Sequence, residues 1–164
     1  MIENTILNIT VNIGISRFPY DGKDAETLVR HAETAMYKVA KGQLDDRICF
    51  YSEEMSKEIE KRFFLINLLM GAIPKKELSI CYQPICDIMN PQNIVGVEAL
   101  LRWNNFILGN VPPDTFIPLA EKTGLIIPIG EWVLEQVCEQ IRLWEEKGFR
   151  VVPVAVNISA KQLE

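Results

Sequence analysis

Two apolar stretches, IVGVEALLRW at residues 94–103 and RVVPVAVNIS at residues 150–159, decide the fold of this chain. Both are rich in β-branched residues, which favours strands, and two helical patterns lie between them at about 114–122 and 128–148. Helices that link two buried strands in this way make a βαβ unit, because parallel strands need a crossover connection. We therefore predict an α/β fold in which these strands run parallel, covered on both faces, in a doubly wound sheet or a barrel.

The residues just before this unit predict one more strand and a long helix. Residues 78–87 (LSICYQPICD) are typical of a strand, and Pro84 inside it favours an edge position or a local irregularity. Residues 52–72 show a helical pattern with apolar side chains on more than one face. Such a helix needs two partners, so it would suit a linker between domains or a dimer interface.

Residues 1–51 predict a separate strand–helix–strand unit. Its first strand is expected over residues 6–16 and its second over 47–51. Between them, apolar residues at spacings of three and four predict a helix over residues 24–41, capped by its first residue and ended by Gly42.

Composition and charge exclude several classes of protein. The 164 residues include 17 Lys and Arg against 22 Asp and Glu, a net charge of −5, with no basic stripe. DNA and RNA are therefore not expected partners. The longest apolar stretch, residues 63–70, is too short to cross a bilayer, and the N-terminus lacks a signal-peptide pattern. We expect a cytoplasmic segment that makes no membrane contact of its own.

The cysteines and the single histidine do not predict a zinc or nucleophilic site. Cys49, Cys81, Cys86 and Cys138 are widely spaced and form no CxxC pair, so we expect reduced, buried thiols. A Ser-His-Asp or Cys-His site would need His31, which has no nucleophile nearby and is expected on the solvated side or the boundary of its helix. Neither GxGxxG nor GxxxxGK[ST] occurs, so glycine-rich phosphate loops are absent.

Polar residues within the apolar strands are the candidate site. Glu98 lies in VGVEALL, where an unpaired carboxylate would be costly to desolvate, so a cation is its natural partner. Asn157 ends its strand, and its side-chain oxygen is a hard donor of the kind that Mg²⁺, Mn²⁺ or Ca²⁺ accepts. In a parallel barrel, residues at the carboxyl ends of strands gather at one face. We expect these two oxygen ligands to meet there.

A structural role stays open for each candidate residue. Glu98 could form a buried ion pair with Arg102, although residues four apart in a straight strand lie roughly 13 Å apart. Asn157 could cap a turn, and Arg102 could bind either a phosphate or a surface carboxylate. Gln83 could hydrogen-bond a base edge or satisfy local backbone.

Four strings in the chain are specific enough to compare with known families: YQPI at 82–85, IVGVEALLRW at 94–103, VPPDTFIPLAEKTGLIIPIGEWVL at 111–134 and VAVNISAKQ at 154–162. Together they resemble the first part of an EAL domain, the phosphodiesterase family that hydrolyses the bacterial messenger cyclic di-GMP. The strings VNIGISRFPYDGKDAETLVRHAETAMY and FYS resemble the tail of a GGDEF (diguanylate cyclase) domain. The resemblance thus implies a tandem GGDEF–EAL protein, with a GGDEF tail at 1–51, a linker helix at 52–76 and the N-terminal part of an EAL domain at 77–164.

For the fold and the site, the resemblance implies an incomplete (β/α)8 barrel, with about the first three strands, that binds Mg²⁺ or Mn²⁺ at the carboxyl ends of its strands. Glu98 matches the glutamate of the EAL motif and Asn157 the asparagine of the NxSxxQ string, both metal ligands in the family. Arg102 matches the arginine that approaches a substrate phosphate. Gln83 matches the glutamine of YQP, near the bound nucleotide.

For the activity, the resemblance implies hydrolysis of cyclic di-GMP to linear pGpG with an Asp pair, a Lys and further acids that later strands supply. The GG[DE]EF loop would precede residue 1, and after Tyr37 the chain departs from the GGDEF pattern, so the usual phosphate-contacting lysine has no direct match. We therefore expect a catalytically incomplete segment of a cyclic di-GMP turnover protein, whose full-length relatives are often membrane-tethered. An open sheet edge predicts self-association or a dimer. The alternatives are a non-catalytic cyclic di-GMP receptor and a protein-interaction or dimerisation module.

Overall fold

The computed structural model describes residues 10–41 and 47–163. Contacts within the chain divide it into two units, Met1–Arg62 and Phe63–Glu164. Helix α2 (Glu53–Met70) runs across this division. No helix in the described ranges is long and apolar enough to cross a membrane.

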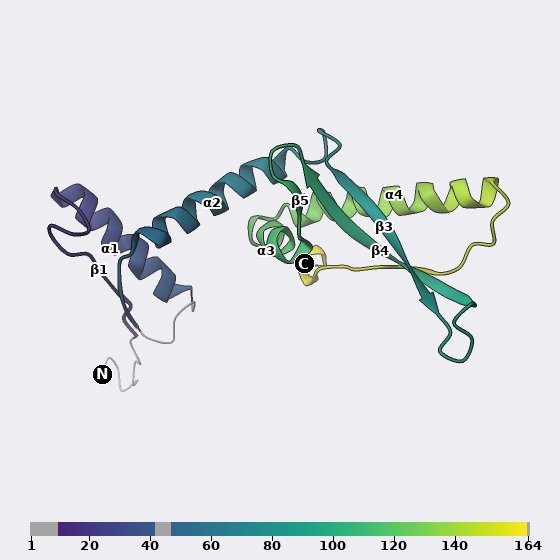
Figure 1. The fold of residues 1–164 in the computed structure, drawn as a ribbon, viewed down its shortest axis with the longest axis horizontal. Coiled ribbons are helices and arrows are strands. Elements are labelled where there is room, and N and C mark those ends of the chain that lie inside the picture. Colours follow the sequence, from purple (N-terminus) through teal and green to yellow (C-terminus); the bar gives the residue numbers. More distant parts are fainter. Residues whose placement is uncertain (1–9, 42–46, 164) are drawn as a thin grey trace, which may run out of the picture. The chain divides into compact units, whose positions relative to one another are not determined.

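In its described residues, the first unit contains a parallel pair of short strands, one helix between them and the first part of α2 (Figure 1). Strand β1 (Ile13–Ile15) pairs with β2 (Ile48–Phe50), and α1 (Ala25–Ala40) connects them. The predicted strand–helix–strand order is confirmed. The first strand is shorter than expected, because residues 10–12 are not in a strand, while residues 6–9 and Gly42 lie outside the described residues.

Local sequence explains how α1 begins and how closely it approaches β1. Asp24 caps the helix as predicted, because its Oδ1 accepts a hydrogen bond from the Thr27 backbone N–H at 2.8 Å. A Cβ at Gly14 would lie 1.9 Å from the Ala32 carbonyl oxygen, so only glycine allows this contact between strand and helix. His31 is half-buried, in agreement with the expected boundary position, and its ring stacks on that of Tyr51 with centroids 3.9 Å apart.

The second unit is a four-stranded sheet with helices packed against it (Figure 1). Strand β4 lies at its centre, antiparallel to β3 and β5 and parallel to β6. The elements are β3 (Leu78–Cys86), β4 (Ile94–Asn105), β5 (Gly109–Val111), α3 (Pro113–Thr123), α4 (Ile126–Glu146), β6 (Val154–Val156) and the 3₁₀ turn η1 (Ala160–Gln162). The predicted βαβ unit is confirmed as β4–α3–α4–β6, whereas the β4–β5 hairpin was not anticipated.

One face of this sheet packs against α3, α4 and the end of α2. Ala99 and Trp103 of β4 are buried there, and Trp103 meets Phe116 of α3 edge to face at 5.6 Å. Burial of a side chain of this size stabilises the fold by about 2–3 kcal/mol. Because side chains alternate along a strand, residues 98, 100 and 102 point to the opposite face, here called the open face.

Two expectations about burial and extent were wrong. The strand expected across residues 150–159 covers only Val154–Val156, and Ala155 between its valines is exposed, so in the described residues this strand is covered on one face. The second crossover helix, expected to start near Pro128, begins at Ile126. Only one thiol, that of Cys49, is buried; the exposed ones are those of Cys81, Cys86 and Cys138.

The edge position that Pro84 favours is confirmed. Strand β3 pairs only with β4 within the part of the chain that the structure describes. The register between the two strands shifts next to Pro84, between Ile85 and Cys86, as the alternative of a local irregularity also predicted.

Candidate functional site

Glu98 and Asn157 come together at the carboxyl end of the parallel strand pair. Glu98 of β4 pairs with Ala155 of β6, and Asn157, two residues farther on, has the same side-chain direction as Ala155. The Asn157 side-chain nitrogen donates a hydrogen bond to Glu98 Oε1 at 2.8 Å. Two residues that are 59 positions apart in the sequence thus share one spot on the open face.

Gln83 lies beside this pair. It stands directly opposite Glu98 in the antiparallel register of β3 and β4, so both side chains project from the open face. Cβ atoms of directly opposed residues lie about 5 Å apart, within reach of a shared ligand. Gln83 itself is exposed, whereas Glu98 is half-buried.

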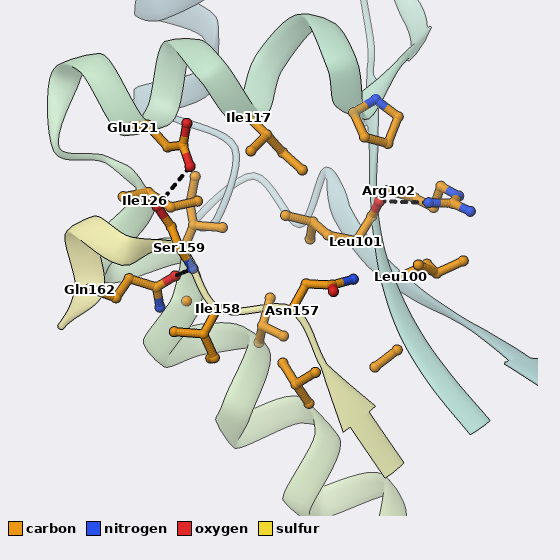
Figure 2. Close-up of a pocket in the computed structure, with 16 residues that line it drawn as sticks. Leu100, Leu101, Arg102, Ile117, Glu121, Ile126, Asn157, Ile158, Ser159 and Gln162 are labelled. Carbon is orange, nitrogen blue, oxygen red and sulfur yellow. Dashed lines mark hydrogen bonds between the residues drawn. The ribbon is translucent and has the colours of Figure 1, made fainter. Parts of the chain in front are cut away.

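Arg102 lies on the open face of β4, two residues after Leu100. Its Nη1 donates to the Leu101 carbonyl oxygen at 2.9 Å, and Figure 2 shows its side chain pointing away from Asn157. The alternative of an ion pair with Glu98 is not realised in the described residues, where the salt bridges involve other arginines and lysines. The guanidinium therefore keeps donors for an outside anion.

A cavity of about 290 Å³ lies next to this site, between β4, β6 and the helices α3 and α4. Arg102 and Asn157 line it together with mostly apolar side chains. Figure 2 also shows two polar residues that sequence reasoning missed: Ser159 donates from its hydroxyl to Glu121 of α3, with Oγ and Oε1 2.7 Å apart. Both residues occur in the strings at 111–134 and 154–162, but nothing in the sequence pairs them.

The residues present fit a hard divalent cation as part of its ligand set. Glu98 offers a carboxylate, and Asn157 offers its Oδ1 if the amide turns, because its nitrogen now faces Glu98. A Mg²⁺ ion takes about six oxygen ligands, often including water and substrate phosphate. Within residues 10–41 and 47–163 no cluster of three or more His, Cys, Asp or Glu side chains could hold a metal, so these two oxygens form a partial site.

A second polar cluster fixes the far end of β4. Glu77 Oε2 accepts hydrogen bonds from Trp103 Nε1 at 3.0 Å and from Asn105 Nδ2 at 2.8 Å. Burial by itself raises the pKa of Glu77, but these hydrogen bonds, together with one from the Phe106 backbone and the charge of Lys75, hold that pKa below its ordinary value. Asn105 Oδ1 in turn accepts from two backbone N–H groups of the β4–β5 turn. The cluster therefore anchors the strand that carries Glu98.

Comparison with known proteins shows the family of this chain. Residues 67–164 match the sequence model of the EAL domain family. The chain belongs to the EAL domain family. Helices α3 and α4, the sheet and the pair Glu98–Asn157 all lie within the matched residues.

Two curated relatives match almost the whole EAL-family chain. MucR of Pseudomonas aeruginosa, a bifunctional diguanylate cyclase/cyclic di-GMP phosphodiesterase, is 41% identical over 157 residues, which cover 95% of this chain and 22% of MucR. The cyclic di-GMP phosphodiesterase PdeR of Escherichia coli is 38% identical over 152 residues, or 93% of this chain and 22% of PdeR. The chain therefore spans about a fifth of the length of these relatives.

Solved structures give the same result for the fold of this EAL-family chain. The MucR phosphodiesterase in complex with cyclic di-GMP matches with a TM-score of 0.54 and 46% identity over 59% of this chain and 39% of that one. The cGMP-bound EAL enzyme Bd1971 matches with a TM-score of 0.52 and 28% identity over 84% of this chain and 38% of that one. The mixed α/β architecture is thus shared with solved EAL proteins.

Proposed function

We propose that this chain forms the first part of an EAL-type (β/α)8 barrel that binds cyclic di-GMP and contributes to its hydrolysis to pGpG. The observation that carries the proposal is the contact between Glu98, inside β4, and Asn157, which directly follows the carboxyl end of the parallel strand β6. Barrels of this kind build their active sites from such positions. The 41% identity to MucR, named as a cyclic di-GMP phosphodiesterase, supports the choice of substrate.

The proposal gives each site residue a role. Glu98 Oε and Asn157 Oδ1 hold a divalent cation, Mg²⁺ or Mn²⁺, on the open face. When bound, that cation acts as a Lewis acid on a phosphodiester and makes water a better nucleophile at neutral pH. Arg102 offers its planar fork to a phosphate, and Gln83, opposite Glu98 in the register, hydrogen-bonds the nucleotide. Further acidic ligands come from residues outside this chain.

The proposal also assigns the rest of the chain. Residues 1–51 form the tail of a GGDEF domain, residues 52–76 a linker helix and residues 77–164 the EAL part. The strand–helix–strand order of β1, α1 and β2 supports the first assignment. So does the match to MucR, a bifunctional protein, which covers 95% of the chain and so includes residues before the EAL match.

The direct test is a calorimetric titration of the 164-residue chain with cyclic di-GMP in Mg²⁺. We expect saturable binding that is at least tenfold weaker in Glu98→Gln, because the neutral amide no longer attracts the cation. Glu131→Gln is the matched control, since Glu131 is an exposed carboxylate on α4 outside the cavity lining, and it should bind like the unmodified chain. Equal binding in all three chains would contradict the assigned role of Glu98.

Hydrolysis is tested in the protein with the whole barrel. Conversion of cyclic di-GMP to pGpG that stops in Glu98→Gln supports the phosphodiesterase assignment. Binding without conversion would favour the alternative of a non-catalytic receptor.

A further inference from the structure

The segment that follows Asn157 is held by side chains rather than by a strand ladder. Strand β6 ends at Val156, so Asn157 itself lies outside the ladder. Ser159, two residues on, donates its hydroxyl to Glu121 Oε1 of α3 at 2.7 Å. Its backbone N–H donates to Gln162 Oε1 at 3.0 Å (Figure 2). Ser159 is therefore the point where this segment is tied down.

Gly130 of α4 makes room for the second tie. A Cβ at Gly130 would lie 1.9 Å from Gln162 Nε2 and 2.7 Å from its Cδ. The clash is with the Gln162 side chain rather than with neighbouring backbone, so the absence of a side chain at Gly130 is what lets Gln162 lie flat on α4. The contact between α4 and η1 therefore depends on the glycine at position 130 of the helix.

We propose that Glu121, Ser159, Gln162 and Gly130, here called the latch, position Asn157 against Glu98. The inference deepens the proposed function, on which its consequence for metal binding rests. Two residues of backbone span at most about 7 Å, so fixing Ser159 on α3 restricts where the Asn157 side chain can lie. Glu121, Ser159 and Gln162 are positioning residues, because none of the side-chain hydrogen bonds that they form in the described chain joins them to Glu98.

An ordinary helix cap does not account for the whole latch. Ser159 and Gln162 form a capping box on η1, and the cap satisfies local backbone groups. The hydrogen bond to Glu121 spans 38 positions of sequence and adds nothing to that cap. Nor does a cap require glycine at residue 130. Both features instead tie the cap to α3 and α4, the helices that also flank the cavity beside Asn157.

The test reads out Asn157 directly, through the NMR signals of its side-chain amide in the 164-residue chain without metal or nucleotide. In Ser159→Ala, we expect the signals to lose at least half of their displacement from the free-amide position, because the bond to Glu98 is no longer held. Ser159→Thr keeps a hydroxyl, so its Asn157 signals should keep their full displacement. Thr123→Val is the matched control: it removes a hydroxyl on α3 that donates only to Leu119 and Ala120 of its own helix.

A double-mutant cycle tests the other half of the latch and covers the case in which Ser159→Ala does not fold. Gly130→Ala should displace Gln162 and shift the Asn157 signals as Ser159→Ala does. In a Gln162→Ala background the same Gly130→Ala change should have no further effect, because the clashing amide is gone. Additive effects of the two changes would overturn the proposal.

Mn²⁺ affinity separates this inference from the proposed function. We expect Ser159→Ala to weaken Mn²⁺ binding at least threefold and Ser159→Thr to leave it unchanged. Unchanged Asn157 signals in Ser159→Ala, or an equal change in Thr123→Val, would overturn the latch whatever the metal result. Shifted signals with no Mn²⁺ binding by any chain would leave the latch supported and count against the proposed metal site.

Discussion

At the scale of single residues, the nature of the partner decides what a polar side chain in an apolar strand can do. Glu98 is half-buried, and its partner, the Asn157 amide, is neutral. The pair thus satisfies the carboxylate with a hydrogen bond and leaves its charge uncompensated. An arginine partner would instead cancel that charge and remove the attraction for a cation.

This argument predicts the effect of Asn157→Asp. Two carboxylates in contact repel each other, as like charges on neighbouring strands do, so we expect the metal-free chain to lose about 1 kcal/mol of unfolding free energy at neutral pH. Added Mg²⁺ should restore it, since the cation then binds between two charged oxygens. Thermal unfolding with and without Mg²⁺ measures both effects. Asn157→Ala is the control, and equal recovery there would argue against a cation at this position.

Glu77 carries a second prediction at the residue scale. Glu77→Ala removes the acceptor from Trp103 Nε1 and Asn105 Nδ2, whose residues are 0% and 2% exposed. Leaving buried donors unpaired costs about 1–3 kcal/mol. Glu77→Gln keeps one oxygen that can accept from both donors, so it should cost less. Denaturant unfolding of the two variants gives the comparison, and equal losses would show that charge rather than hydrogen bonding matters.

The lowered pKa of Glu77 also predicts how stability depends on pH. The folded chain holds this carboxyl ionised to a lower pH than the unfolded chain, for which the ordinary pKa is 4.5. Its stabilising contribution is therefore complete above the ordinary pKa and is lost as pH falls through the lower, folded pKa. Between about pH 6 and pH 2, the unfolding free energy should decrease less steeply in Glu77→Gln than in the unmodified chain, as measured by denaturant unfolding at each pH. An identical fall in both chains would contradict this assignment.

At the scale of the element, single residues set the helix ends, because they adopt a backbone conformation that other residues adopt less easily. Helix α3 starts with Pro113 and ends at Gly124, which has a φ of 79°, in the left-handed region. Gly148 has a φ of 75° just after α4. These stops turn the chain between the crossover helices and back toward β6, so they determine whether Asn157 reaches Glu98.

Gly124→Ala tests this stop without a steric complication. A Cβ at Gly124 has no atom within 4 Å, so its only cost is the left-handed backbone, about 1–2 kcal/mol of unfolding free energy. Gly124→Asn should cost less, because asparagine tolerates this conformation. Thermal unfolding of both variants is the measurement. A larger loss in the asparagine variant would point to the side chain rather than the backbone.

At the scale of the whole molecule, much apolar surface stays exposed in the described residues. On α2, Phe63 is 64% exposed and Met70 is 62% exposed, so the second face predicted for this helix has no partner here. Strand β3 leaves one edge unpaired within the described chain, and Ile85 is 44% exposed beside it. Surfaces of this kind favour association.

We therefore predict that the 164-residue chain associates with itself at micromolar concentrations. Sedimentation velocity should show a species heavier than the monomer. Ile85→Lys should shift it toward the monomer, because a charge on the edge strand disfavours pairing. Lys75→Arg is the control: it changes an exposed residue, conserves its charge and should leave the sedimentation profile unchanged. A monodisperse monomer at all concentrations would refute the prediction.

The sequence by itself determined the features that depend on near neighbours. The order of strands and helices follows from apolar periodicity, and the cap at Asp24 and the stop at Gly124 follow from local backbone chemistry. The position of Glu98 within an apolar strand was equally visible. The family resemblance could be read for the same reason, because its motifs are continuous strings.

Only the tertiary structure decided which distant residues meet. The β4–β5 hairpin, the short extent of β6 and the exposure of three thiols depend on how elements pack, which periodicity does not record. The hydrogen bond from Ser159 to Glu121 joins two elements across 38 positions, and that from Asn157 to Glu98 crosses 59. No local signal pairs such residues, since their contact arises only when the crossover helices bring β6 beside β4.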